Sequence, residues 1–152
     1  MKIGVISDTH TRFISDMPRD IILALSSMDL IVHAGDITHN DVLNGLRETG
    51  EVIAVCGNMD TGTLRDMLPQ TEMLSIHGKK IGIIHGWGSP WGLEEKLMEK
   101  FPDADVIIYG HTHQPKNEYI NGVLFFNPGP GSKSFGILTV TEDSVEGRII
   151  HI

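Results

Sequence analysis

Residues 2–10 read Lys-Ile-Gly-Val-Ile-Ser-Asp-Thr-His, and this stretch decides the fold. A short aliphatic run ends abruptly at two polar side chains, Asp8 and His10. Aliphatic and β-branched residues without polar alternation are typical of a strand that is buried on both faces. The pattern therefore predicts a central strand of a parallel sheet whose carboxyl end carries an acidic and an imidazole side chain.

The same order, a strand and then a polar residue, recurs farther along the chain. The run at 30–35 ends at Asp36, and the run at 51–56 ends at Gly57 and Asn58. The segments between these runs fit two crossover helices, one from about Pro18 to Met28 and one from Asp41 to Glu48. Two strand–helix–strand units are therefore predicted in the N-terminal half.

After Pro69 the pattern changes to hairpins and a third helix. The expected elements are a helix at 93–101 and strands at 73–77, 81–84, 106–109, 118–120, 123–126, 137–140 and 145–150. The dipeptide Asn121-Gly122 between two of these strands is a strong hairpin signal. No linker or internal repeat divides the chain. We therefore expect one domain, residues 1–152, with the architecture of a two-sheet α/β sandwich.

Composition limits the classes of partner. The 152 residues carry a formal net charge of −8, which argues against an extended surface for nucleic acid, because such surfaces need clustered Lys and Arg. No apolar run is long enough for a membrane span, so no membrane partner is expected. The one cysteine, Cys56, cannot form an intramolecular disulfide and suits a reducing cytoplasm, where we expect the protein to reside.

The polar residues at the predicted strand ends have the chemistry of a two-metal site. Seven of them offer carboxylate, amide or imidazole groups: Asp8, His10, Asp36, Asn58, His85, His111 and His113. Two divalent cations about 3.5–4 Å apart need such oxygen and nitrogen ligands, with a carboxylate placed to bridge them. Because carboxyl ends of strands in α/β sheets form a crevice, residues distant in sequence can converge there.

These motifs, Asp-x-His, Gly-Asp, Gly-Asn, His-Gly and Gly-His-x-His in this order, resemble the calcineurin-like metallophosphoesterase family. The short chain, and Met-Asp after Gly-Asn, resemble its small single-domain phosphodiesterase branch. The resemblance implies a bridging role for Asp36 between two metals held by Asp8, His10 and His113 on one side and by Asn58, His85 and His111 on the other. It implies two divalent ions, manganese by expectation, with iron, nickel and zinc as alternatives, and a hydroxide that they activate.

The resemblance also suggests a substrate class. Many phosphoesterases of this type have His after Gly-Asn, where it helps to protonate the leaving oxygen, whereas this chain has Met59. We therefore expect a small phosphodiester substrate, such as a nucleotide, with a good or strained leaving group. Asp36, Asn58 and His85 are the residues expected to act in catalysis, and the resemblance favours a homo-oligomer.

Other interpretations stay open. One is a non-catalytic interaction scaffold, since the retromer subunit resembles this chain in size and order of motifs, and another is a two-metal hydrolase of non-phosphate substrates. We expect His33 to be a satisfied core residue and at least one of Trp87 and Trp91 to cap the core. Five further side chains have two interpretations each, in or near the site or outside it: Arg12, His39, Asp60, Arg65 and Ser132.

Overall fold

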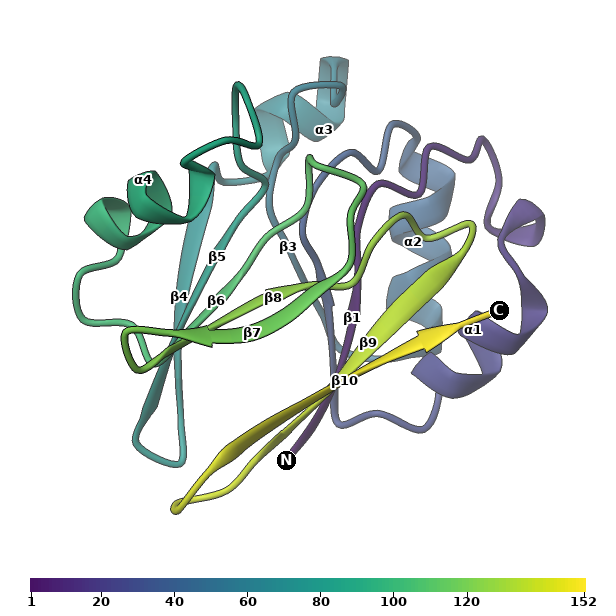
Figure 1. Cartoon of the computed structure of the whole chain (residues 1–152). Helices are drawn as coiled ribbons and strands as arrows, with labels where there is room; N and C mark the ends of the chain where they lie inside the picture. Colours follow the sequence, from purple (N-terminus) through teal and green to yellow (C-terminus); the bar gives the residue numbers. More distant parts are fainter.

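Two five-stranded sheets form the centre of the molecule in a computed structural model that describes residues 1–152 (Figure 1). The first sheet has the order β10-β9-β1-β2-β3 and the second has the order β4-β5-β6-β8-β7. The strands of the first sheet are β1 (Lys2–Ile6), β2 (Leu30–His33), β3 (Val52–Ala54), β9 (Ser134–Val140) and β10 (Val145–His151). Those of the second are β4 (Thr71–Ile76), β5 (Lys79–Ile84), β6 (Val106–Ile108), β7 (Lys116–Ile120) and β8 (Val123–Asn127).

The parallel strands bring the candidate ligands to one end of the molecule. β1 pairs in parallel with β2, and β2 with β3, which confirms the two strand–helix–strand units. In the second sheet, β5, β6 and β8 are parallel, while β4 and β7 run antiparallel along its edges. The carboxyl ends of β1, β2 and β3 and those of β5 and β6 therefore lead into the loops drawn above the sheets in Figure 1.

Four α-helices and a short 3₁₀ helix, η1 (Ile14–Asp16), complete the fold: α1 (Arg19–Leu25), α2 (Asn40–Thr49), α3 (Gly62–Met67) and α4 (Leu93–Lys100). α1 begins after Pro18 as predicted but ends before Met28. The hydroxyls of Ser26 and Ser27 donate to the carbonyls of Leu23 and Ala24, and such local bonds favour the end of a helix. α3 was not predicted, since six residues are too few to show helical periodicity. No helix combines the length and apolar character required to cross a bilayer.

Three groups of buried side chains define the layers. The first lies between the sheets and includes Val5, Val32, Ile83 and Phe126. A second lies between the first sheet and helices α1, α2 and α3, and a third packs α4 against the second sheet. The predicted two-sheet α/β sandwich is therefore confirmed. The expectation of one domain, residues 1–152, stays a prediction.

The first hairpin turns earlier than predicted. His77 and Gly78 both have positive φ, 51° and 78°, and form a two-residue turn, so β5 begins at Lys79 and not at Ile81. Two-residue hairpin loops favour this left-handed backbone because its twist matches that of the strands. Side chains also join the two sheets along one edge. Asn117 and Tyr119 of the edge strand β7 donate to the carbonyls of Gly147 and Val145 of the edge strand β10.

The inter-sheet core contains a close approach that mutation can test. A Cβ atom at Gly136 would overlap the ring of Phe126, which is fully buried. We expect Gly136→Ala to lower the free energy of unfolding by about 1–3 kcal/mol, because overpacking forces the ring or the backbone to move. Urea denaturation measures the change. Gly50→Ala is the matched control, since a Cβ there meets only Ile31 at 3.4 Å, and an equal loss in both variants would contradict this account.

Candidate metal centre

Most candidate ligands have a backbone conformation that side chains seldom adopt. Five of the seven have positive φ: Asp8 50°, His10 49°, Asp36 58°, His111 67° and His113 58°. Left-handed backbone is uncommon outside glycine and is found where the surrounding structure enforces it, above all at functional sites. Hydrogen bonds join the loops that carry these residues, from the amide of Asp8 to the carbonyl of Gly35 and from that of Gly110 to His85.

The glycines of the motifs allow the loops to approach each other. A Cβ at Gly57 would overlap the carboxylate and amide of Asp36, and one at Gly35 would lie 2.7 Å from the ring of His85. Gly35 also has a φ of 97°, which glycine adopts without strain. The glycines in Gly-Asp and Gly-Asn are therefore required by the close packing of the ligand loops.

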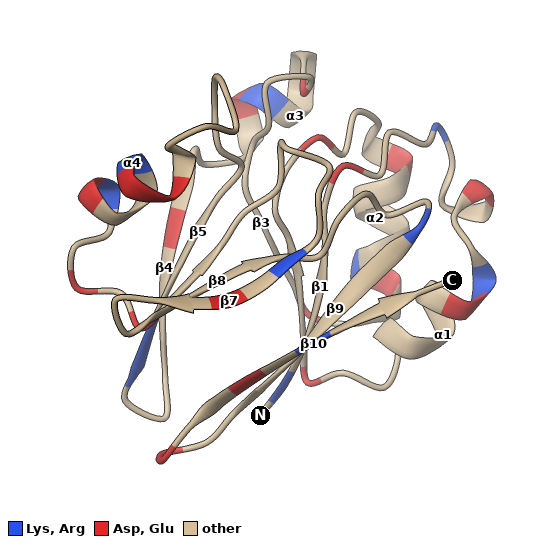
Figure 2. Ribbon diagram, in the orientation of Figure 1, with Lys and Arg blue, Asp and Glu red and all other residues tan.

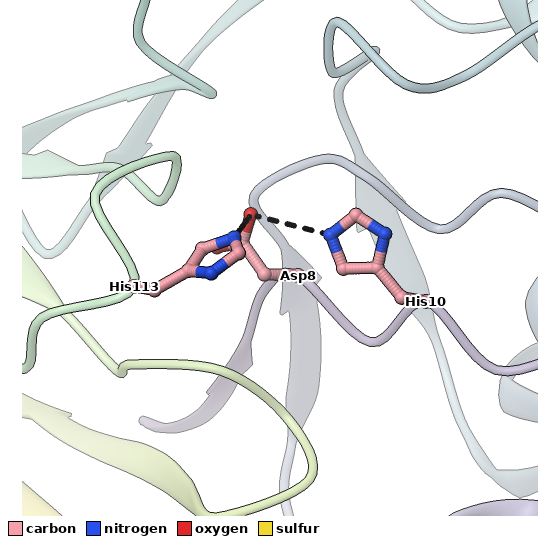
Figure 3. A group of neighbouring side chains, drawn as sticks. All are labelled: Asp8, His10 and His113. Carbon is pink, nitrogen blue, oxygen red and sulfur yellow. Dashed lines mark ion pairs between the residues drawn. The ribbon is translucent and has the colours of Figure 1, made fainter. Parts of the chain in front are cut away.

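The carboxylate of Asp8 is buried with one oxygen unsatisfied. Oδ2 accepts hydrogen bonds from the Ser7 hydroxyl and the His111 amide, whereas Oδ1 has no hydrogen-bond donor. His113 and His10 flank this free oxygen, their Nε2 atoms lying 3.2 and 3.9 Å from it (Figure 3). A buried carboxylate oxygen without a partner is costly, and a cation between these three groups would satisfy it.

His85 points its free nitrogen at acceptor oxygens. Its Nδ1 lies 2.7 Å from the carbonyl of Ala34, so Nδ1 carries the proton and donates it to this acceptor. Its Nε2 faces Asn58 Oδ1 at 3.0 Å, Asp36 Oδ2 at 3.3 Å and Asp8 Oδ1 at 3.8 Å. Three acceptors around one imidazole nitrogen require either a second proton or a cation, so these residues fit a bound metal.

Asp36 lies between the two histidine sets. Its Oδ2 is 3.5 Å from His10 Nε2 and 3.3 Å from His85 Nε2, while its Oδ1 accepts a hydrogen bond from the Met59 amide. Asp36 therefore has the position that a bridging carboxylate needs. The ligand atoms of Asp8, Asp36 and His85 all lie within 4.8 Å of one another, as do those of Asp8, His10 and His113, so Asp8 belongs to both groups.

The closeness of Asp36 and His85 shifts the pKa values of both groups. Burial disfavours the charged form of Asp36, but hydrogen bonding with His85 and the Met59 amide outweighs it and lowers the pKa of the carboxyl. Burial likewise opposes charge on His85, yet Asp36, Asp8 and the Ala34 carbonyl raise the pKa of the imidazole. In the metal-free centre a proton thus takes the place that a cation can occupy.

His111 is the candidate ligand that stands apart. Its Nε2 lies 2.8 Å from the carbonyl of Gly88, and its ring packs edge-on against His85 with centroids 5.4 Å apart. It forms no ion pair with Asp8 or Asp36. The structure therefore brings six of the seven candidates together through their side chains and places His111 beside them, tied to the loop that follows His85.

Asp60 lies near the candidate ligands and has a structural role there. Its carboxylate is 1% exposed and accepts three hydrogen bonds from backbone amides, those of Asp36 at 3.0 Å, Thr38 at 2.7 Å and Gly57 at 2.7 Å. It is therefore neither a solvated turn residue nor a partner of a ligand imidazole. It fixes the loop of Asp36 against the loop of Asn58.

Asn127 anchors the remaining ligand loop. Its buried amide donates to the carbonyl of Gly110 and the hydroxyl of Thr112, on either side of His111, and its oxygen accepts from the Gly129 amide. The sequence signal for this anchor is the Asn-Pro-Gly segment at 127–129. The structure shows how it supports the loop.

The other histidines lie outside the centre. His33 is fully buried, with Nε2 3.0 Å from the Thr9 hydroxyl and Nδ1 accepting from the Gly35 amide, which confirms a satisfied core residue. Burial, reinforced by the positive potential of His85, lowers the pKa of His33 to about 3. His39 lies at the start of α2, where its Nδ1 contacts the Thr38 hydroxyl.

Several exposed side chains surround the centre. The expectation that a tryptophan caps the core is wrong, because Trp87 is 43% and Trp91 is 85% exposed. Both follow His85 in a loop that contains several glycines with positive φ. Arg12 packs over the ring of Phe13, with 5.4 Å from its guanidinium carbon to the ring centroid. Met59 is 55% exposed next to Asn58, so its side chain does not pack in the core.

Two cavities open on opposite sets of candidate ligands. The Trp87 cavity, about 480 Å³, is lined by Asn58 and His85 together with Arg65, Trp87 and Lys100. The His113 cavity, about 450 Å³, is lined by Asp8, His10 and His113 together with Ser132, Lys133 and His151. The ligand groups therefore lie between two hollows of similar size.

Comparison with known proteins gives consistent results. A family model described as the calcineurin-like phosphoesterase superfamily domain matches residues 1–142. A "Probable metallophosphoesterase" of Methanocaldococcus jannaschii is 40% identical over an alignment of 162 positions, which covers 100% of this chain and 82% of the relative. These matches agree with the resemblance found in the motifs.

Solved structures show the same architecture. An archaeal phosphodiesterase superposes with a TM-score of 0.79 at 26% identity, covering 99% of this chain and 100% of the other. The zinc complex of Vps29 from Entamoeba histolytica gives a TM-score of 0.78 at 24% identity, with 99% of each chain covered, and shares the fold.

The role of Asp60 can be tested by removing its charge. We expect Asp60→Asn to lower the free energy of unfolding of the metal-free protein by about 2–4 kcal/mol, because an amide cannot accept all three buried hydrogen bonds. Urea denaturation in chelator measures this loss. Asp105→Asn is the control, because Asp105 accepts one backbone hydrogen bond, from Lys80, at an exposed site. Equal losses in the two variants would contradict the assigned role.

The buried His33 predicts acid sensitivity. Its pKa is about 3 in the folded chain and near 6.5 when unfolded, so the unfolded chain binds more protons between these values. Stability should therefore fall as the pH decreases through this window. Urea midpoints of metal-free protein at several pH values between 7 and 4 should decrease less in His33→Asn than in wild type. The exposed His151→Asn should follow wild type, and parallel curves for all three proteins would rule out this source of acid sensitivity.

Proposed function

The chain belongs to the calcineurin-like phosphoesterase superfamily, which comprises metal-dependent hydrolases of phosphoric esters, and we propose that it is a phosphodiesterase with a two-cation centre. The main support for a cation centre comes from two atoms whose neighbours call for positive charge. Asp8 Oδ1 has no donor, and His85 Nε2 faces three oxygens. Divalent cations fit these groups, because carboxylate, imidazole and amide are their ordinary ligands.

In the proposed centre Asp8, His10 and His113 would hold one cation and Asn58, His85 and His111 the other, with Asp36 shared between them. His111 would have to give up its contact with the Gly88 carbonyl or use its other nitrogen. Bound cations would supply a water of lowered pKa as nucleophile and stabilise charge on the phosphoryl oxygens. The chain's residues hold this arrangement rigidly, since Ala34 orients His85 and Asp60 fixes the loops of Asp36 and Asn58.

Preference for a diester is supported by the two cavities. A phosphodiester has two ester arms, and the Trp87 and His113 cavities offer a hollow beside each set of ligands. Met59, exposed next to Asn58, has a thioether that cannot protonate a leaving oxygen. We therefore propose substrates whose leaving group needs no acid, such as aryl diesters or cyclic nucleotides. A relative of the chain, 28% identical over 144 residues, is a phosphodiesterase of Methanocaldococcus jannaschii.

A protein-interaction scaffold is the second candidate. The exposed Trp91 and the likeness in fold to Vps29 support it. Against it, a scaffold has no need to keep Asp8 and Asp36 buried together, where the like charges repel. We therefore favour the enzyme.

The finer properties are proposals of the same kind. We propose manganese as the native cation, a nucleotide as substrate and the cytoplasm as location, with iron, nickel or zinc as alternative metals. Assembly into a homo-oligomer stays a prediction.

Hydrolysis of bis(p-nitrophenyl) phosphate tests the proposal. Chelator-stripped protein should be inactive, manganese should restore turnover, and kcat/KM should exceed that for p-nitrophenyl phosphate. Asp36→Asn should lower kcat/KM by roughly 10²–10⁴-fold, because it weakens both cation sites.

The matched control is Asp103→Asn, an exposed aspartate in the loop after α4, which should behave as wild type. Inactivity with every divalent metal would favour the scaffold. Faster hydrolysis of the monoester would overturn the diester preference while leaving the metal centre in place.

A further inference from the structure

The Trp87 cavity has an unusual charge for this acidic chain. The chain has 20 acidic and 12 basic residues, yet this cavity is lined by Arg65 and Lys100 and by no Asp or Glu. Neither cation forms an ion pair. Figure 2 shows blue segments in α3 and α4, the helices that carry Arg65 and Lys100 in their last turns. An unpaired positive lining attracts an anionic group.

A third cavity, on the side of the molecule that carries Trp91, has no unpaired positive lining. It has a volume of about 890 Å³ and is lined by Trp91, Glu94, Lys116 and Glu118. Its lysine is already paired, with Nζ 2.9 Å from Glu94 and 3.6 Å from Glu118. Its net charge therefore disfavours an anion, although an aromatic side chain is present there too.

The loop that carries Trp87 is held beside the ligands. Trp87 is two residues after His85, and the carbonyl of Gly88 accepts a hydrogen bond from His111. The indole is 43% exposed and lines the cavity. Planar aromatic groups stack on tryptophan, and nucleobases do so without regard to base identity.

We propose that the Trp87 cavity binds one ester arm of the substrate and that this arm is a nucleoside phosphate, with its base on Trp87 and its phosphate near Arg65 and Lys100. This inference rests on the proposed phosphodiesterase centre, because Asn58 and His85 form part of the same cavity wall. The volume of about 480 Å³ lies within the usual range for small-ligand sites, roughly 300–1,000 Å³. The preferred substrate is then a nucleotide diester that carries a second phosphate.

Binding to the metal-free protein tests the cavity independently of hydrolysis. The chain has two tryptophans, so Trp91→Phe leaves Trp87 as the fluorescent reporter. The probe is adenosine 3′,5′-bisphosphate, which contains no diester. We expect saturable quenching, and in a Trp91→Phe background Arg65→Gln combined with Lys100→Gln should raise the Kd by about tenfold or more.

The matched control combines Arg47→Gln and Lys80→Gln, two exposed cations at the ends of α2 and β5 remote from the ligand loops. It should leave the Kd within about twofold of the parent. Absence of quenching, equal Kd values in the two double variants, or equally tight binding of adenosine itself would overturn the proposal.

Turnover by the manganese-loaded protein gives a second measure. We expect a larger kcat/KM for the 5′-phosphorylated dinucleotide pApA than for ApA, and a ratio that falls by about tenfold when Arg65 and Lys100 are both replaced. An unchanged ratio would overturn the assignment of the phosphate. If the bisphosphate binds as expected but bis(p-nitrophenyl) phosphate is not hydrolysed, the phosphodiesterase proposal fails and the cavity assignment stands.

Discussion

The burial of two carboxylates close together is the constraint on which the centre depends. Asp8 and Asp36 are 2% and 3% exposed, and their ligand oxygens lie within 4.8 Å of each other and of His85. No Lys or Arg pairs with either carboxylate. Removing two like charges from water costs free energy unless positive charge compensates it. Imidazoles supply part of that charge, and divalent cations would supply the rest.

The fold supports this centre by fixing the backbone of the loops. Parallel strands deliver Asp8 and Asp36 to the same end of the first sheet, and left-handed φ angles then turn both side chains inward. Asp60 accepts hydrogen bonds from amides of the loops that carry Asp36 and Asn58, and Asn127 donates to a carbonyl of the loop that carries His111. The positions of the ligands are therefore determined by hydrogen bonds from outside the ligand set. Such support keeps a site in its working geometry before anything binds.

Much of this arrangement could be predicted because it follows from local pattern. The aliphatic runs that end at Asp8 and Asp36 predicted parallel pairing, and the dipeptide at 121–122 predicted an antiparallel hairpin; the structure has both. What could not be predicted depends on contacts between distant segments. Asp60 binds an amide 24 residues earlier, and nothing local distinguishes it from a turn aspartate. The exposure of Trp87 likewise depends on how the loop after His85 packs.

The central claim is that the buried pair of carboxylates organises two cations in one centre. The most direct test is titration of chelator-stripped protein with manganese, followed by electron paramagnetic resonance. This account predicts two ions per chain and a spin-coupled signal, because Asp36 would join ions that lie about 3.5–4 Å apart. A single ion, or two ions with uncoupled spectra, would contradict it.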